Sequence, residues 1–127
     1  MERERKRKSV LAIDDEQIVR ISCERVLRIA GYDIDTSADG QSALKMIDEK
    51  KYDLILTDLK MPGMDGIEVM SEIKKRLPGT RVIVVTGYST LDTAVKAIKM
   101  GAHNYIEKPF SPETLLAAVR DALGEKT

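Results

Sequence analysis

The sequence predicts an α/β fold in which helices cover both faces of a parallel β-sheet. Along the chain, a short apolar run and a stretch with helical periodicity alternate five times. The apolar runs are bounded by polar or turn-forming residues, which is typical of strands buried on both faces. Strands that alternate with helices of about 10–15 residues form right-handed βαβ units, so we expect all of the strands to run parallel.

The first expected strand covers residues 10–13, and the first helix runs from about residue 16 to residue 30. The apolar residues of this helix recur at spacings of three and four and therefore share one face. They are Val19, Cys23, Val26, Leu27 and Ala30. Gly31 then supplies a helix stop, because glycine adopts the left-handed conformation that ends many helices. The second strand is expected over residues 34–37.

The second helix begins after Asp39, whose carboxylate is expected to cap it, and it carries Ala43, Leu44 and Ile47 on its apolar face. The third strand follows over residues 54–57. Residues 61–66 then form a compact loop rich in turn-forming residues. A third helix carries the apolar residues Val69, Met70, Ile73 and Leu77, and Pro78-Gly79 ends it.

The fourth strand covers residues 82–85, which are all apolar and β-branched, as expected for a central strand. A fourth helix, from about 91 to 100, carries Ala94, Val95 and Ile98 and stops at Gly101. The fifth strand covers residues 104–107. The last helix is capped by Ser111, has Pro112 at its first position, and buries Leu115, Leu116, Val119 and Leu123.

Composition limits the classes of protein to which the chain can belong. Its 127 residues suit one domain, and 43% hydrophobic with 33% charged residues describes a soluble globular protein. A net charge of zero gives no basic surplus for nucleic acid, and no apolar stretch approaches the roughly 18 residues of a membrane span. A single cysteine excludes an internal disulfide and fits a reducing cytoplasm. We expect a charged, flexible tail over 1–7, one domain over 8–124, and the start of a linker at 125–127.

The notable polar residues lie where the predicted strands end. Asp14 and Asp15 follow the first strand, Asp58 follows the third, Thr86 the fourth and Lys108 the fifth. Strands of one parallel sheet end at the same edge, so these side chains should converge there. Like charges in contact repel by roughly 1–4 kcal/mol per pair, so such a cluster indicates a bound cation or a reaction. Carboxylate oxygens suit Mg²⁺, which often shares a phosphate oxygen.

The chemistry of this set fits the acceptance of a phosphoryl group. A carboxylate such as Asp58 can act as a nucleophile and form an aspartyl phosphate. A metal ion and the point charge of Lys108 can neutralise the transferring group, and the Thr86 hydroxyl can donate a hydrogen bond to it. The single histidine, His103, lies at the opposite end of the fifth strand, so no residue serves as a dedicated general base. The site is therefore equipped to accept phosphate rather than to turn over a substrate quickly.

At these residues the chain resembles the receiver domain of a two-component response regulator, over about residues 8–124. The matching pieces, in the order of the family, are Asp14-Asp15-Glu16, Thr57-Asp58-Leu59-Lys60-Met61-Pro62-Gly63-Met64-Asp65-Gly66, Val84-Val85-Thr86-Gly87, Gly101-Ala102 and Lys108-Pro109-Phe110. The resemblance implies a flavodoxin-like, doubly wound five-stranded sheet of order 2-1-3-4-5 with five helices. It also implies a cis peptide bond between Lys108 and Pro109.

The resemblance further implies a role for individual residues. Asp58 would be the phosphoacceptor, with Thr86 and Lys108 in contact with the phosphoryl group. Mg²⁺ would be bound directly by Asp15, Asp58 and the backbone carbonyl of Lys60, and through water by Asp14. Tyr105 would be the aromatic switch residue that moves with Thr86. Lys60 and Tyr88 would flank the path of the attacking water and set the lifetime of the phosphorylated form.

The expected function is a phosphorylation switch in the cytoplasm, driven by a sensor histidine kinase or a phosphotransfer protein. Phosphorylation would reshape the surface of the fourth helix, fifth strand and fifth helix. That surface would pair with a second copy or control an output, with transcription as the expected output. The domain itself would bind no nucleic acid or membrane and would catalyse only its own phosphorylation and slow dephosphorylation.

Three alternatives stay open at the level of sequence. An aspartate-nucleophile phosphohydrolase that depends on Mg²⁺ usually carries Asp-x-Asp, but position 60 is lysine. A flavodoxin would need a phosphate loop rich in Ser, Thr and Gly after the first strand, where this chain has Asp14-Asp15-Glu16. The third alternative is a receiver-like docking module that is never phosphorylated.

Overall fold

A computed structural model of the chain describes residues 7–61, 63, 65–87 and 90–125. The described strands are β1 (Ser9–Ile13), β2 (Asp33–Ser37), β3 (Leu54–Thr57), β4 (Arg81–Thr86) and β5 (Asn104–Glu107). The described helices are α1 (Gln17–Ile29), α2 (Gly40–Glu49), α3 (Gly66–Arg76), α4 (Leu91–Lys99) and α5 (Pro112–Ala122). Among these helices, none has both the length and the apolar character that crossing a bilayer requires. Most of the predicted tail, and residues 126–127 of the predicted linker, lie outside the described residues.

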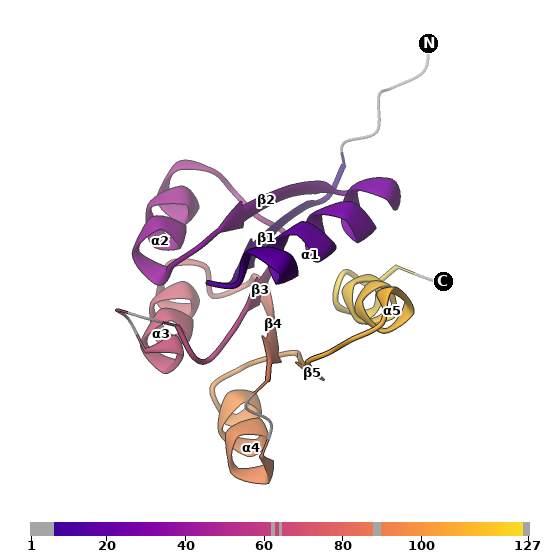
Figure 1. The fold of residues 1–127 in the computed structure, drawn as a ribbon. Helices are drawn as coiled ribbons and strands as arrows, with labels where there is room; N and C mark the ends of the chain where they lie inside the picture. Colours follow the sequence, from indigo (N-terminus) through magenta and orange to yellow (C-terminus); the bar gives the residue numbers. More distant parts are fainter. Residues whose placement is uncertain (1–6, 62, 64, 88–89, 126–127) are drawn as a thin grey trace.

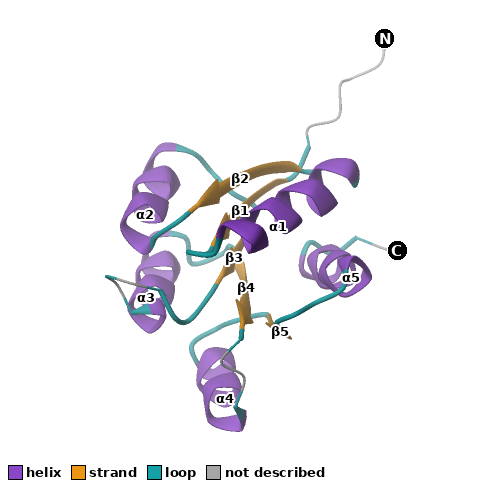
Figure 2. Ribbon diagram, viewed as in Figure 1, coloured by secondary structure: helices purple, strands orange, loops and turns teal. Residues whose placement is uncertain are grey.

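The strands form one parallel sheet in the order β2-β1-β3-β4-β5, which confirms the expected fold class. Helices α1 and α5 cover one face of the sheet, and α2, α3 and α4 lie on the other (Figure 1). The strands form a single layer between these two groups of helices (Figure 2). All five strands point the same way, so the loops that follow them gather at one edge.

The core consists of two apolar clusters, one on each face of the sheet. Successive side chains of a strand point to opposite faces, so Val10 and Ala12 of β1 belong to the cluster under α1 and α5. Leu11 and Ile13 belong to the cluster under α2, α3 and α4. Because helices cover both faces of the sheet, the alternating side chains of β1 and β3 are buried on both sides. This explains why these two strands consist mainly of apolar residues in an uninterrupted run.

The helix starts agree with the sequence. The Asp39 carboxylate accepts a hydrogen bond from the backbone N–H of Ser42 at 2.8 Å, at the start of α2. The Ser111 hydroxyl accepts from the N–H of Thr114 at 3.1 Å, with a proline in the first turn of α5. These side chains use donors that the first turn of a helix leaves unpaired.

Helix α4 packs on the sheet through little of its surface. Ala97 is its buried residue, and Leu91, Val95 and Ile98 are exposed by 80%, 43% and 50%. The apolar residues Val95 and Ile98, which the sequence places on one face of this helix, therefore face outward. These apolar side chains of α4 therefore lie on the surface of the domain.

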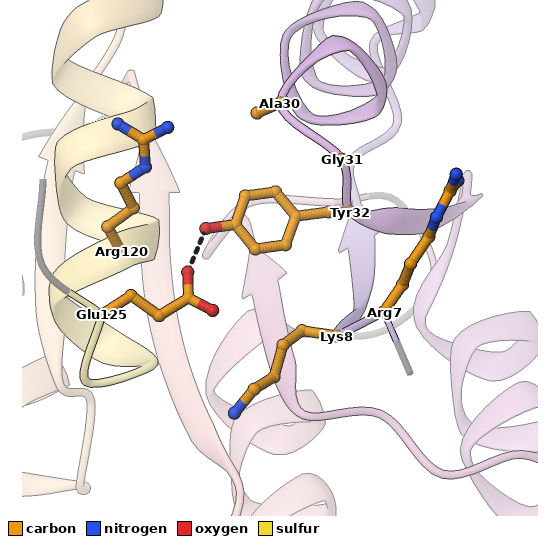
Figure 3. A pocket seen from close by; sticks show the side chains of 7 residues that line it. All are labelled: Arg7, Lys8, Ala30, Gly31, Tyr32, Arg120 and Glu125. Carbon is orange, nitrogen blue, oxygen red and sulfur yellow. Dashed lines mark hydrogen bonds between the residues drawn. The ribbon is translucent and has the colours of Figure 1, made fainter. Parts of the chain in front are cut away.

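The ends of α1 and α5 meet at the amino edge of the sheet. Each helix ends with a left-handed glycine, Gly31 (φ 98°) and Gly124 (φ 72°). The next residues, Tyr32 and Glu125, return their N–H groups to the last helical turn, and the Tyr32 hydroxyl donates to the Glu125 carboxylate at 2.5 Å. Figure 3 shows the Tyr32 ring pointing from the end of α1 toward the end of α5. Arg120 and the two residues before β1 line the same cavity of about 680 Å³.

Candidate functional site

The carboxyl edge of the sheet brings together charged residues that directly follow three different strands, β1, β3 and β5. The N–H of Asp14 donates to the carbonyl of Ser37, and the N–H of Asp58 donates to the carbonyl of Ile13, at 3.0 and 3.2 Å. The N–H of Lys108 donates to the carbonyl of Thr86 at 2.9 Å. These bonds continue the strand ladders by one residue, so the sheet itself fixes the backbone from which the three charged side chains extend.

The Lys108 ammonium lies at the centre of the site. Its Nζ is 2.7 Å from Asp14 Oδ2, 2.8 Å from Asp58 Oδ2 and 2.8 Å from Glu16 Oε1. The Lys108–Pro109 peptide bond is cis, as the resemblance implies. The convergence of Asp14, Asp58 and Lys108 that the strand ends predict is therefore present in the structure.

The Asp58 carboxylate is held on both oxygens. Oδ1 accepts hydrogen bonds from the backbone N–H of Leu59 at 2.6 Å and of Lys60 at 3.2 Å. Oδ2 accepts from the Lys108 ammonium. The residue is 3% exposed and lines a cavity at this edge of the sheet, and these bonds fix the orientation of its carboxylate. A fixed carboxylate oxygen at an opening is what a nucleophile requires.

The Asp14 carboxylate is also held on both oxygens, with Lys108 on Oδ2. Its Oδ1 accepts from the N–H of Glu16 at 2.9 Å, and its backbone carbonyl accepts from Arg20 Nη1 at 2.7 Å. Burial raises the pKa of the Asp14 carboxyl, and the hydrogen bond from Lys108 only partly offsets this effect. The ionised form of Asp14 is therefore less favourable in this position than it would be in water.

Lys108 stays charged in the site. Burial alone would lower its pKa, but hydrogen bonds to Asp14, Asp58 and Glu16 outweigh burial and raise the pKa above its usual value. One ammonium thus serves three carboxylates, which leaves the cluster short of positive charge. Oxygen atoms of the same three acids lie within 4.8 Å of one another. The hard carboxylate oxygens of the two buried acids, Asp14 and Asp58, suit Mg²⁺.

The structure adds Glu16 to the residues that the sequence assigned to the site. The sequence names Asp14 and Asp15 as metal-binding acids, but the acids whose oxygens cluster are Asp14, Glu16 and Asp58. Asp15 is exposed and lines a cavity of about 620 Å³ together with Asp58 and Lys60. Glu16 immediately precedes α1, and no periodicity showed that its side chain would turn back over the sheet edge.

The remaining predicted residues lie around this centre. Thr86 ends β4 and is completely buried. Tyr105 is half-buried on β5, and its hydroxyl is 3.0 Å from Thr93 Oγ1 in the first turn of α4. Lys60 is exposed and contributes its N–H to Asp58. Tyr88, predicted to influence the lifetime of the phosphorylated form, lies outside the described residues.

No imidazole lies in the described part of this site. His103 precedes β5 at the opposite edge of the sheet, where its ring nitrogens are 2.7 Å from Arg81 Nη1 and 3.1 Å from Asp121 Oδ2. The arrangement therefore offers a fixed carboxylate, an ammonium and oxygen ligands. It offers no histidine to activate water, as the sequence predicted.

Comparisons with known proteins agree with this geometry. The sequence model of the family described as response regulator receiver domain matches residues 10–120. A putative response regulator NtrX-like of Rickettsia bellii (strain RML369-C) is 39% identical over 115 residues, which are 89% of this chain and 24% of that protein. The DNA-binding transcriptional regulator NtrC of Escherichia coli (strain K12) is 39% identical over 114 residues, 90% of this chain and 24% of that protein. The chain thus spans about a quarter of the length of these relatives.

Solved structures give the same result. A CheY-like response regulator receiver domain protein from Methanospirillum hungatei JF-1 superposes with a TM-score of 0.90 at 33% identity, covering 94% of this chain and 95% of that one. The beryllofluoride-activated NtrC4 receiver domain dimer matches with a TM-score of 0.87 at 40% identity, covering 91% and 96%. Fold, site and sequence together show that this chain belongs to the response regulator receiver domain family.

Proposed function

We propose that the protein is a phosphoacceptor switch of a two-component system and that Asp58 is the acceptor. The observation that carries the proposal is the Asp58 carboxylate, fixed by two backbone N–H groups and by Lys108 at the base of an open cavity. An oxygen of Asp58 attacks the phosphorus of a phosphohistidine. The new P–O bond forms as the P–N bond breaks, and the imidazole leaves with the electron pair of that bond.

The residues of the site neutralise the group that Asp58 receives. Lys108 contacts the phosphoryl oxygens, and Thr86 donates its hydroxyl to one of them. Asp15, Asp58 and the Lys60 carbonyl would hold Mg²⁺ directly, and Asp14 would hold it through water; the ion would supply positive charge to the transferring group. The support for this assignment is the shortage of positive charge among three clustered carboxylates that share one ammonium.

Phosphorylation changes the surface formed by α4, β5 and α5. The phosphoryl group carries about −1.5 to −2 charges and takes the place of the single negative charge of the Asp58 carboxylate, so up to about one negative charge is added beside the end of β4. Thr86 moves toward the new oxygens, and Tyr105 turns inward, leaving its contact with Thr93 on α4. The exposed apolar residues of α4, Leu91, Val95 and Ile98, then pair with a second copy of the domain. A related domain solved as a beryllofluoride-activated dimer supports pairing with a second copy.

The phosphodonor is a sensor histidine kinase or a phosphotransfer protein that docks beside α1. A cavity of about 920 Å³ lies there and is lined by the apolar side chains of Ile18, Ile21 and Phe110. It shares Glu16 and Lys108 with the acceptor cavity, so a partner seated in it holds its phosphohistidine close to Asp58. The output is control of transcription in the cytoplasm, supported by the NtrC relatives, and the domain itself binds no nucleic acid.

The activity of the domain is limited to its own phosphorylation and to slow loss of the phosphoryl group. Lys60, together with Tyr88, which lies outside the described residues, sets the rate of that loss. We expect replacement of both by alanine to change the dephosphorylation rate more than twofold, measured by the decay of the labelled protein. A smaller change contradicts this assignment.

Labelling with a small phosphodonor tests the proposed function. Incubation with acetyl phosphate and Mg²⁺ is expected to add one phosphoryl group, located at Asp58 by peptide mass spectrometry. Asp58→Asn should abolish the label, and Asp48→Asn, which changes a surface acid paired with Arg76, should retain it. Continued labelling of Asp58→Asn to the same extent contradicts the assignment.

The same experiment separates the alternative functions. Rapid release of many equivalents of phosphate by the wild-type protein would favour a phosphohydrolase. No labelling at all would favour a docking module.

A second experiment tests the docking cavity beside α1. Ile21→Lys should slow phosphotransfer from a phosphohistidine-bearing protein and leave labelling by acetyl phosphate unchanged. Equal slowing with both donors would place the effect in the acceptor chemistry instead.

A further inference from the structure

The Lys108 ammonium has as many carboxylate partners as it has protons. Three N–H bonds meet Asp14, Asp58 and Glu16 at 2.7–2.8 Å. A phosphoryl group on Asp58 needs one of these donors, so one existing contact must open. We propose that Glu16 is the displaceable partner, which occupies one donor of Lys108 until the phosphoryl group takes its place. This inference rests on the proposed function.

Burial indicates which contact opens. The side chains of Asp14 and Asp58 are only 5% and 4% exposed, and Glu16 is 56% exposed. Asp14 and Asp58 are also held by backbone N–H groups, which fix them independently of Lys108. The Glu16 carboxylate can pass into water with little loss, because an exposed ion pair contributes little stability. Release of Glu16 therefore costs less free energy than release of either buried acid.

The position of Glu16 shows that its side chain serves the site rather than the helix. Glu16 stands at the N-cap of α1, where a short polar side chain such as Ser, Thr, Asp or Asn commonly accepts a hydrogen bond from the first turn. Its side chain makes no such capping bond and instead reaches Lys108, 92 residues further along the chain. Because Glu16 also lines the docking cavity beside α1, a partner seated there meets it.

A direct metal contact is the competing role for Glu16, and it predicts the opposite result. If Glu16 were a ligand of Mg²⁺, its neutralisation would weaken metal binding and, through it, binding of the phosphoryl group. If Glu16 only competes for Lys108, its neutralisation strengthens phosphoryl binding and leaves Mg²⁺ binding nearly unchanged. The two roles therefore separate when both affinities are measured on the same variant.

The test uses beryllofluoride as a non-reactive phosphoryl analogue. The affinities of wild type, Glu16→Gln and Glu16→Ala are measured by amide NMR titration, first with Mg²⁺ alone and then with beryllofluoride in excess Mg²⁺. Both variants should bind beryllofluoride more tightly, by about three- to fivefold, the change that an exposed ion pair supports. Their Mg²⁺ affinity should stay within about twofold of wild type. Glu24→Gln, which alters an acid paired with Arg28 on the same helix, is the matched control and should change neither affinity.

Each outcome distinguishes the inference from the proposed function. An unchanged or weaker affinity of Glu16→Gln for beryllofluoride overturns the proposal that the phosphoryl group displaces Glu16 from Lys108. A large loss of Mg²⁺ affinity would instead identify Glu16 as a metal ligand. If the wild-type protein binds beryllofluoride and is labelled at Asp58, those results leave the proposed function intact. If the wild type neither binds nor is labelled, the proposed function fails, and this inference fails with it.

Discussion

Replacing Lys108 by methionine should destabilise the domain and make its stability strongly dependent on pH. Methionine keeps much of the length and apolar stem of lysine but removes the charge on which Asp14 and Asp58 depend. The Lys108 side chain is only 11% exposed, so water cannot replace the ammonium freely. The variant thus leaves two buried carboxylates close together without a counter-ion.

The size of the effect follows from burial. Removal of one partner from a buried ion pair costs roughly 3–5 kcal/mol. The third partner, Glu16, is largely exposed and adds little, so we expect a loss of about 3 kcal/mol in the free energy of unfolding near neutral pH.

The sign of the pH dependence follows from Asp14. Burial raises the pKa of its carboxyl, and the loss of Lys108 raises that pKa further. For an acid whose pKa is higher in the folded state, stability is fully present below the unfolded pKa and is lost as the pH rises through the folded value. The destabilisation caused by Lys108→Met should therefore be largest near neutral pH and shrink toward acid pH.

Urea unfolding followed by circular dichroism measures this effect at about pH 7.5 and about pH 5. Lys45→Met, on the exposed side of α2, is the matched control and should change the unfolding free energy little. Added Mg²⁺ should recover part of the loss, because a bound cation replaces the missing charge. An equal loss at both pH values, or a more stable variant at neutral pH, would refute the idea that Lys108 neutralises this cluster.

Three further predictions concern the frame around the site. Gly66→Ala should lose about 1–3 kcal/mol of stability, because its Cβ would lie 2.4 Å from the backbone of Leu59. Gly79→Ala is the control and should keep the wild-type stability, because its Cβ would meet no atom within 4 Å. Equal urea midpoints for the two variants would contradict this prediction. Cys23 should react with iodoacetamide only on unfolding, because burial raises the pKa of its thiol to about 12. Fast labelling of the folded protein at about pH 8 would show that the thiol is accessible and would contradict this prediction. Tyr32→Phe should lower the unfolding free energy by about 1 kcal/mol, the value of one lost hydrogen bond, and an unchanged urea midpoint would show that this bond is not stabilising.

The parts of the fold that the sequence predicts are those governed by periodicity and by capping. Strands buried on both faces appear as uninterrupted apolar runs, and Asp39 and Ser111 mark helix starts through their side-chain oxygens. The convergence of Asp58 and Lys108 is also predictable, because parallel strands end at one edge. The order of the strands did not follow from these patterns and came from the family resemblance.

The sequence predicts less where the direction of a side chain decides the outcome. Glu16 sits at a helix entry, and only the three-dimensional structure shows its carboxylate meeting Lys108. The apolar residues Val95 and Ile98 fit a helical stripe, but a stripe does not say whether sheet, solvent or a partner covers it. In this protein the buried contact of α4 is made by the small residue Ala97 instead.

The hydrogen bond between Tyr32 and Glu125 connects the last described turn of the chain to the turn between α1 and β2. That corner is on the side of the sheet remote from Asp58, so events at the acceptor reach it only through the body of the domain. The backbone at Glu125 is therefore held against the body of the domain by this side-chain bond as well as by its own N–H bond to Arg120. A rotation of α5 would accordingly change the distance between Glu125 and Tyr32.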